Sequence, residues 1–217
     1  MKNTTKLAIV SALMLTNTFT NVAFAQSENS GFLGDYSALS ETKDAAGDKV
    51  MRYISPKLTS ADYQSVIIDP IQYYPAPKPT DQVTASTLTE ISNYVDKGLQ
   101  EKLGGKLTLA SEPGPGVIRV RPAITAVSAN SPGLKPYEIV PVGFLISSVK
   151  GRGKEAAIQI EVEMVDSISG ELLGASVRKG IGAKLASKDA KLSLKDVQPL
   201  LDKWIDTGSS FVAERLK

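Results

Sequence analysis

The sequence predicts an α+β protein in which an antiparallel or mixed sheet carries two amphipathic helices packed on one face. Three observations support this class: helical spacing of apolar residues in the middle of the chain, the same spacing near its end, and strict alternation of apolar and polar residues between them. Elements in this order are typical of a sheet with its helices on one side. With 217 residues, 42% hydrophobic and 22% charged, the chain has the composition of an ordinary globular protein.

The first 25 residues have the features of a secretory signal peptide. A basic start is followed by a short apolar run and then by the small-large-small end Ala23, Phe24 and Ala25. The apolar run is far shorter than the roughly 20 residues that cross a bilayer. We therefore predict cleavage after Ala25, export to the periplasm, and a mature chain without a transmembrane helix. The alternatives are an uncleaved anchor and a cleavage site shifted by a few residues.

Composition excludes several classes of function. The chain has 25 basic and 23 acidic residues, and the leader contains two lysines and no acid, so the mature chain is neutral and lacks the basic excess of a nucleic-acid binder. The absence of cysteine and histidine excludes Ser-His-Asp triads, Cys-His pairs and the usual zinc sites. Without a cysteine after the leader there is no attachment point for a lipid anchor. We expect no enzyme activity, no metal and no cofactor.

After the leader we expect an extended N-terminal arm over residues 26–56 and a single α+β domain over residues 57–217. The arm is polar except for one cluster that should dock on the domain, formed by Phe32, Leu33, Tyr36 and Leu39. The domain begins with a β-branched apolar block at residues 66–68. Consecutive apolar positions predict a strand covered on both faces, and Pro70 should end it.

The first amphipathic helix should end at Gly104 and Gly105, where a left-handed glycine closes it. Its apolar residues recur three and four apart, as one helix face requires. They are Leu88, Ile91, Val95, Leu99 and Leu103.

The second helix lies at the end of the chain, with Ser193 or Asp196 as its cap. Pro199 is expected in the first turn, where its missing N–H is not needed. The helix should bury Trp204 against the sheet. Its stripe contains Val197, Leu201, Trp204, Gly208, and Phe211 or Val212.

Between the helices, residues 117–128 predict a strand with one buried face and one face exposed to solvent, because apolar and polar residues alternate along it. The apolar residues are Ile118, Val120, Ile124 and Ala126, and the polar ones are Arg119, Arg121 and Thr125. Pro122 favours an edge or a bulge near the middle of that strand. Residues 137–149 are apolar on both parities, so they are consistent with a buried strand or a short helix.

A hairpin follows, with alternating residues on its first strand: Ile158, Ile160, Val162 and Met164 against Gln159, Glu161 and Glu163. The turn at residues 166–170 offers Asp and Ser as caps and Gly170 for a positive φ. On the return strand we expect an apolar face of Leu173, Ala175 and Val177, with Ser176 and Arg178 opposite. Glu161 and Glu163 are then a solvated outer face, and a catalytic carboxylate pair is the alternative.

Four residues are the best candidates for a binding surface. Tyr73 and Tyr74 precede a proline-rich segment, and Arg119 and Arg121 form a basic outward face. Tyrosine and arginine are the residues most enriched in binding hot spots. The alternative for the two tyrosines is a pair at a sheet edge with one ring buried.

Several stretches together resemble a known bacterial family: "SGFLGDYSAL", "RYISP" with "YQSVIIDPI", "GPGVIRVRPAITAV", "YEIVPVGFLISSVKG" and "IEVEMVDSISGELLGASVRKG". The family is domain of unknown function 3313, whose members are mostly envelope lipoproteins without an assigned activity. The resemblance implies an envelope location more than a function. This sequence departs from the family at the lipid-attachment cysteine. Its strand, Asp-turn-Gly-Glu, strand unit is also similar to one in envelope accessory proteins of the curli-secretion and peptidoglycan-synthase-activator type, which act through protein contacts.

The sequence leaves three hypotheses about function. The first is a non-catalytic periplasmic adaptor that binds another, unidentified cell-envelope protein. The second is a carrier of a small apolar or anionic ligand, and the third is a carboxylate-dependent hydrolase. A carrier predicts an apolar cavity with a few convergent polar groups, whereas an adaptor predicts a flat aromatic patch and no deep pocket.

Overall fold

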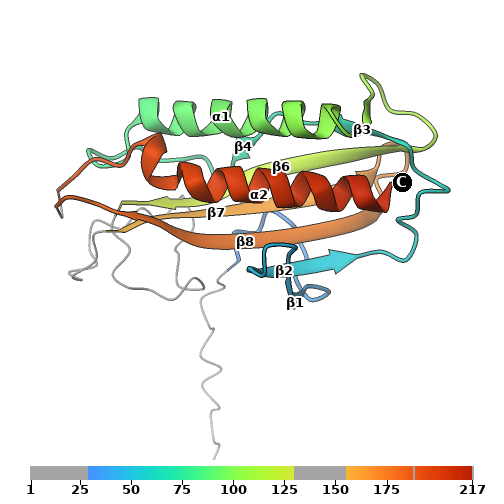
Figure 1. Ribbon diagram of the computed structural model, residues 1–217, viewed down its shortest axis with the longest axis horizontal. Coiled ribbons are helices and arrows are strands. Elements are labelled where there is room, and N and C mark those ends of the chain that lie inside the picture. The colour runs from blue at the N-terminus through green and yellow to red at the C-terminus, as the bar shows by residue number, and fades with distance from the viewer. Residues whose placement is uncertain (1–28, 130–154, 188, 217) are drawn as a thin grey trace, which may run out of the picture.

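The computed structural model describes residues 29–129, 155–187 and 189–216 (Figure 1). Within these residues one open, mixed sheet of eight strands carries two helices on one face, so the predicted α+β class is confirmed. The strand order is β1-β2-β8-β7-β6-β3-β5, and β4 also pairs with β6. The predicted leader, its cleavage point at Ala25 and the ambiguous residues 137–149 lie outside the described residues.

The first predicted helix is α1 (Ala85–Gly104), capped by Thr84, whose side chain accepts a hydrogen bond from the Thr87 amide. The expected left-handed closure is wrong, because Gly105 has a φ of −73°. The chain instead keeps a right-handed turn past the helix end, with the Leu107 amide donating to the carbonyl of Leu103 at 2.8 Å.

The second helix is α2 (Leu194–Arg215), with Ser193 as its N-cap. The Ser193 amide donates to the Asp196 carboxylate at 2.8 Å, as in a capping box. Because this cap fixes the helix start, Pro199 falls at the sixth helical residue rather than in the first turn, so its expected position is wrong. The burial of Trp204 is confirmed, with 7% of the residue exposed.

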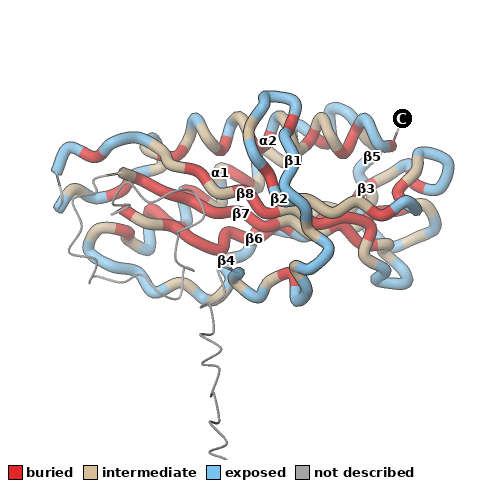
Figure 2. The backbone as a smooth tube through the Cα atoms, turned by 90° about the horizontal axis from the view of Figure 1, so that it is seen from below, coloured by how far each residue is buried: buried red, intermediate tan, exposed pale blue. Residues whose placement is uncertain are grey.

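The centre of the sheet is formed by three long antiparallel strands, β6 (Val117–Ser128), β7 (Glu155–Asp166) and β8 (Leu172–Lys184). Figure 2 shows these strands buried along most of their length. The β7–β8 turn is as predicted: the carboxylate of Asp166 accepts from the amides of Ile168 and Ser169, and Gly170 has a φ of +72°.

The strands β1 (Ser40–Lys43) and β2 (Lys49–Ile54) extend the sheet beyond β8. They lie in the segment expected to be an extended arm. The expected docking of the preceding cluster is confirmed, since Leu33 is buried against Ala175 and Val177. The cluster lies under the sheet, on the face away from the helices (Figure 1).

On the other side of β6, three short strands run parallel: β3 (Ser65–Ile68), β4 (Gln72–Tyr73) and β5 (Thr108–Leu109). The predicted strand before Pro70 is confirmed, although only Val66 in it is fully buried. Pro122 lies where pairing passes from β3 to β4, so no partner needs its missing N–H there. The expected bulge near the middle of β6 lies at Thr125, shortly after Pro122, and Thr125 is buried rather than exposed to solvent.

A register irregularity reverses part of the face assignment expected for β8. Met164 pairs with Gly174 and Val165 with Leu172, so Leu173 is an extra residue. One extra residue moves all later side chains to the opposite face. Ala175 and Val177 therefore contact the N-terminal cluster, whereas Ser176 and Arg178 face the helices, contrary to the prediction.

The main core lies between the helices and this central sheet. Ile91 and Val95 of α1 and Leu201 and Trp204 of α2 pack with Ile158 of β7. Within the described part of the chain, neither helix is long and apolar enough to cross a membrane.

Candidate functional site

Glu161 is not the solvated carboxylate that the alternation predicted. It is 0% exposed, with the Tyr36 hydroxyl donating to its Oε2 at 2.6 Å and the Gln159 amide donating to its Oε1 at 2.7 Å. Burial, followed by the hydrogen bond to Glu161, raises the pKa of Tyr36. Alternation shows which residues share a face of a strand, but it does not show what covers that face. Here the N-terminal cluster covers the face that carries Glu161.

The second predicted carboxylate, Glu163, is occupied by an arginine. Its Oε2 lies 2.7 Å from Nη1 of Arg121, with 15% of the Glu163 side chain exposed. Arg119 likewise pairs with Asp69, at 2.9 Å. The basic outward face expected from the two arginines is therefore largely neutralised by neighbouring acids.

The two candidate tyrosines lie in different environments. Tyr73 donates a 2.6 Å hydrogen bond from its hydroxyl to the carbonyl of Leu88 in α1, and burial raises its pKa. Tyr74 is 39% exposed and contacts Phe32 edge to face, with ring centroids 5.7 Å apart. The pair thus has one ring half-buried against the helix and one ring at the surface. A binding role for Tyr73, Tyr74, Arg119 or Arg121 stays a prediction.

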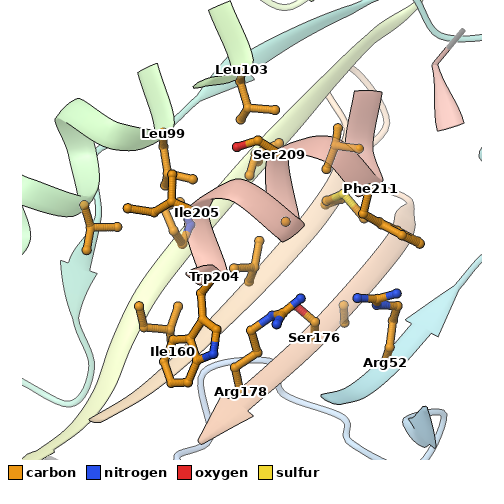
Figure 3. A pocket seen from close by; sticks show the side chains of 18 of the residues that line it. Arg52, Leu99, Leu103, Ile160, Ser176, Arg178, Trp204, Ile205, Ser209 and Phe211 are labelled. Atoms are coloured by element: carbon orange, nitrogen blue, oxygen red, sulfur yellow. The ribbon is translucent and has the colours of Figure 1, made fainter. Parts of the chain in front are cut away.

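A more complete site lies on the opposite face of the sheet. A cavity of about 90 Å³ opens beneath α2, between the two helices and strands β2, β6, β7 and β8 (Figure 3). We call it the α2 cavity. Its walls are mostly apolar, and its polar lining consists of Arg52, Ser176, Arg178 and Ser209.

Arg178, the inward-facing residue of β8, is already paired. Its Nη1 lies 2.5 Å from Oδ2 of Asp44, which is in the turn between β1 and β2. Burial acts to raise the pKa of Asp44, but the hydrogen bond from Arg178 and those from the amides of Asp48 and Ala46 outweigh it and hold that pKa below its usual value. A second ion pair, Lys203 to Asp48 at 2.6 Å, ties the same turn to α2.

Arg52, on β2, has a different environment. Its guanidinium lies 3.9 Å from the ring centroid of Phe211, a cation–π contact. In Figure 3 the ends of Arg52 and Arg178 point toward one another across Ser176. Burial and then repulsion from Arg178 lower the pKa of Arg52. Among the described residues no carboxylate forms an ion pair with Arg52.

Two residues of α2 provide an unpaired polar group and free space in the cavity. The hydroxyl of Ser209 is buried and has no hydrogen-bond partner in the part of the chain that the structure describes. Buried polar groups are normally paired, so this oxygen is free to contact a ligand. Gly208 also lines the cavity, and a Cβ placed on it would meet open space.

This arrangement offers several kinds of contact to a ligand. It combines apolar walls, positive charge at one side and a free hydroxyl. Among the described residues no group of three acidic side chains is placed to hold a metal ion.

Neither Arg52 nor Arg178 is among the site residues predicted from the sequence. Arg178 was assigned to the wrong face, and Arg52 lay in the expected arm. The alternation of Val50, Arg52 and Ile54 against Met51 and Tyr53 could have indicated that Arg52 shares a face with apolar residues.

Comparisons with known proteins agree with the resemblance drawn from the sequence. Residues 28–207 match the family model described as Protein of unknown function (DUF3313). The Uncharacterized lipoprotein YdcL of Escherichia coli strain K12, and the protein of the same name in strain O157:H7, are each 31% identical over 186 residues. The match covers 84% of this chain and 84% of each relative.

Solved structures show weaker likenesses. The hypothetical protein CT253 from Chlamydia trachomatis aligns with a TM-score of 0.42 at 10% identity, over 69% of this chain and 98% of its own. A PelC dodecamer subunit from Paraburkholderia phytofirmans aligns with a TM-score of 0.41 at 9% identity, over 77% and 97%. These values support no conclusion about ligands or partners.

Proposed function

The chain belongs to the family described as Protein of unknown function (DUF3313), and from that premise we propose that it is an exported, non-catalytic protein of the bacterial cell envelope that binds a small ligand in the α2 cavity. The single observation that carries the proposal is the cavity itself. Apolar walls with a few convergent polar groups are the usual features of a small-molecule site.

The size of the cavity limits the ligand. The volume of about 90 Å³ is several times the roughly 10–15 Å³ that a cavity needs to hold one water molecule. Pockets for drug-sized ligands have volumes of about 300 Å³ or more. The site therefore takes a small molecule or the end of a longer chain.

The proposed compartment rests on the leader and on the relatives. The YdcL relatives are named as lipoproteins, and residues 1–25 have the features of an exported leader. Because this chain contains no cysteine, it lacks the residue that carries such a lipid. We accordingly place the mature protein in the periplasm without a lipid anchor.

The protein contact hypothesis remains as a second candidate, since Tyr74 is a large side chain exposed beside the docked Phe32. An unidentified envelope protein is its expected partner, and Arg121 lies on the same face. The hydrolase hypothesis loses its support, because Glu161 is buried with both oxygens occupied and Glu163 is paired with Arg121.

Ligand binding can be tested with a neutral apolar probe. Trp204 lines the cavity and is the only tryptophan, so its fluorescence reports on occupancy. We expect 1-pentanol to change this fluorescence with saturation. Gly208→Leu should abolish the change by filling the cavity, whereas Glu214→Leu, an exposed position on the same helix outside the cavity lining, should not. An equal response of the two variants, both shown to be folded by circular dichroism, would refute the proposal.

A further inference from the structure

The charges around the α2 cavity are not balanced. Arg52 and Arg178 line it, and Arg215 lies 5.3 Å from the ring of Phe211, on which Arg52 also rests. Asp44 is the acidic residue that interacts with this group. Among the described residues Arg178 forms an ion pair with Asp44, whereas Arg52 and Arg215 form none, which leaves the cavity mouth positively charged.

Asp44 neutralises one arginine in particular. Its Oδ2 is bonded to Arg178, and its Oδ1 accepts from the amides of Ala46 and Asp48 at 2.9 Å each. The turn that holds Asp44 is fixed to α2 by Lys203. Arg178 is thus occupied by a carboxylate that the fold holds in place.

Of the two arginines that line the α2 cavity, Arg52 is the one left to receive an external anion. The ring of Phe211 holds its guanidinium through a π contact, and such a contact leaves the N–H donors of the guanidinium edge available. Arg52 is also partly exposed, so an anion can approach it from solvent. Repulsion from Arg178 and Arg215 would be relieved when that anion binds.

The apolar walls begin beside this charge. Trp204, Val212 and Ile160 line the same cavity as Arg52, and the free hydroxyl of Ser209 and the open space at Gly208 lie along it. A molecule bound at Arg52 can therefore place an apolar tail of a few carbons under α2.

From this geometry we propose that the ligand is an anionic amphiphile, with one carboxylate or phosphate group on Arg52 and a linear apolar tail in the α2 cavity. The proposal rests on the proposed function, since it specifies the ligand of the same site. It assigns charge selectivity to Arg52 and leaves Arg178 to Asp44.

The test compares three probes of the wild-type protein at pH 7, read by Trp204 fluorescence and calorimetry. Pentanoate has both a tail and a charge, 1-pentanol has the tail alone, and acetate has the charge with almost no tail. We expect pentanoate to bind at least tenfold more tightly than either control, equivalent to about 1.4 kcal/mol. Equal binding of pentanoate and 1-pentanol overturns the anionic proposal but leaves the proposed function standing. Absence of binding by all three overturns both.

Arg52→Gln should reduce pentanoate binding at least tenfold and leave 1-pentanol binding unchanged. Arg119→Gln is the matched control, because Arg119 lies on the other face of the sheet and is paired with Asp69. Equal loss in the two variants would overturn the role of Arg52. If Arg52→Gln fails to fold, the comparison of wild-type probes decides the proposal alone.

Two sources could supply this chemistry, and a second pair of probes separates them. Octanoate represents a free fatty acid, and a monoacyl phosphatidylglycerol represents a membrane lipid. Tighter binding of octanoate indicates a free acid, and tighter binding of the phospholipid indicates a lipid ligand. Weaker binding of both than of pentanoate indicates a short-chain anion, whose tail is no longer than the α2 cavity can hold.

Discussion

Replacing Tyr36 with phenylalanine removes the hydroxyl that donates to the fully buried carboxylate of Glu161. The hydrogen bond is 2.6 Å long and links residues 125 positions apart, so it attaches the N-terminal cluster to β7. Hydrogen bonds to charged groups contribute about 1.5–3 kcal/mol, and a buried acceptor that loses its donor loses most of that. The same hydroxyl accepts from the amides of Gly31 and Leu33, which also lose a partner.

We therefore expect Tyr36→Phe to lower the free energy of unfolding by about 2 kcal/mol, measured by urea denaturation. For a protein of this size that corresponds to a melting temperature lower by roughly 4–8 °C. Tyr53→Phe is the control, because Tyr53 packs in the same cluster and no hydrogen bond of its hydroxyl is found among the described residues. We expect that control to stay within about 0.5 kcal/mol of wild type.

A double-mutant cycle with Glu161→Gln tests whether the two side chains act on each other. Residues in direct contact show coupling energies of about 0.5 kcal/mol or more. If Tyr36→Phe is as stable as Tyr53→Phe, or if the cycle shows no coupling, the reasoning that Glu161 is a buried, arm-covered carboxylate is refuted.

Three further predictions concern stability. Asp44→Ala leaves Arg178 buried without a counter-charge, so we expect a loss of about 3–5 kcal/mol in urea denaturation, and a loss below about 1 kcal/mol would contradict the buried pair. Burial and then a hydrogen bond to a neighbouring carboxylate raise the pKa of Tyr63 to about 12 from an unfolded value of about 10. Its contribution is complete below pH 10 and is lost as the pH rises toward 12, so the alkaline slope of unfolding free energy should shrink in Tyr63→Phe. A Cβ on Gly182 would clash with the backbone carbonyl oxygen of Asp196 in α2, whereas one on Gly208 meets open space. Gly182→Ala should therefore lower the melting temperature and Gly208→Ala should raise it, and the opposite order would contradict the packing.

Sequence patterns were sufficient to predict the elements whose structure depends only on residues close together in the chain. The stripe of α1 is an intrinsic property of its own residues, and so is the turn that ends at Gly170. The error at Pro199 has the same local origin, because the helix start was placed too late relative to the Ser193 cap.

Non-local features could not be predicted in this way. One unpaired residue, Leu173, reverses the faces of the β8 residues after it, and periodicity carries no information about where a bulge falls. The burial of Glu161 depends on Tyr36, far away in the chain, and Arg178 becomes a cavity residue only because of the bulge. The candidate site was missed for these reasons, not because its residues are unusual.

The segment that looked least structured in the sequence connects the two faces of the sheet. On one face, Tyr36 closes over Glu161, and on the other, Asp44 holds Arg178 beside the α2 cavity. After these two contacts the chain continues into β2, which places Arg52 at the cavity mouth. Loosening of this segment would thus uncover a buried carboxylate and also free Arg178 from its internal partner. Because an anion at the mouth would interact with the arginine that Asp44 leaves unpaired, ligand binding and the ordering of the segment should favour each other.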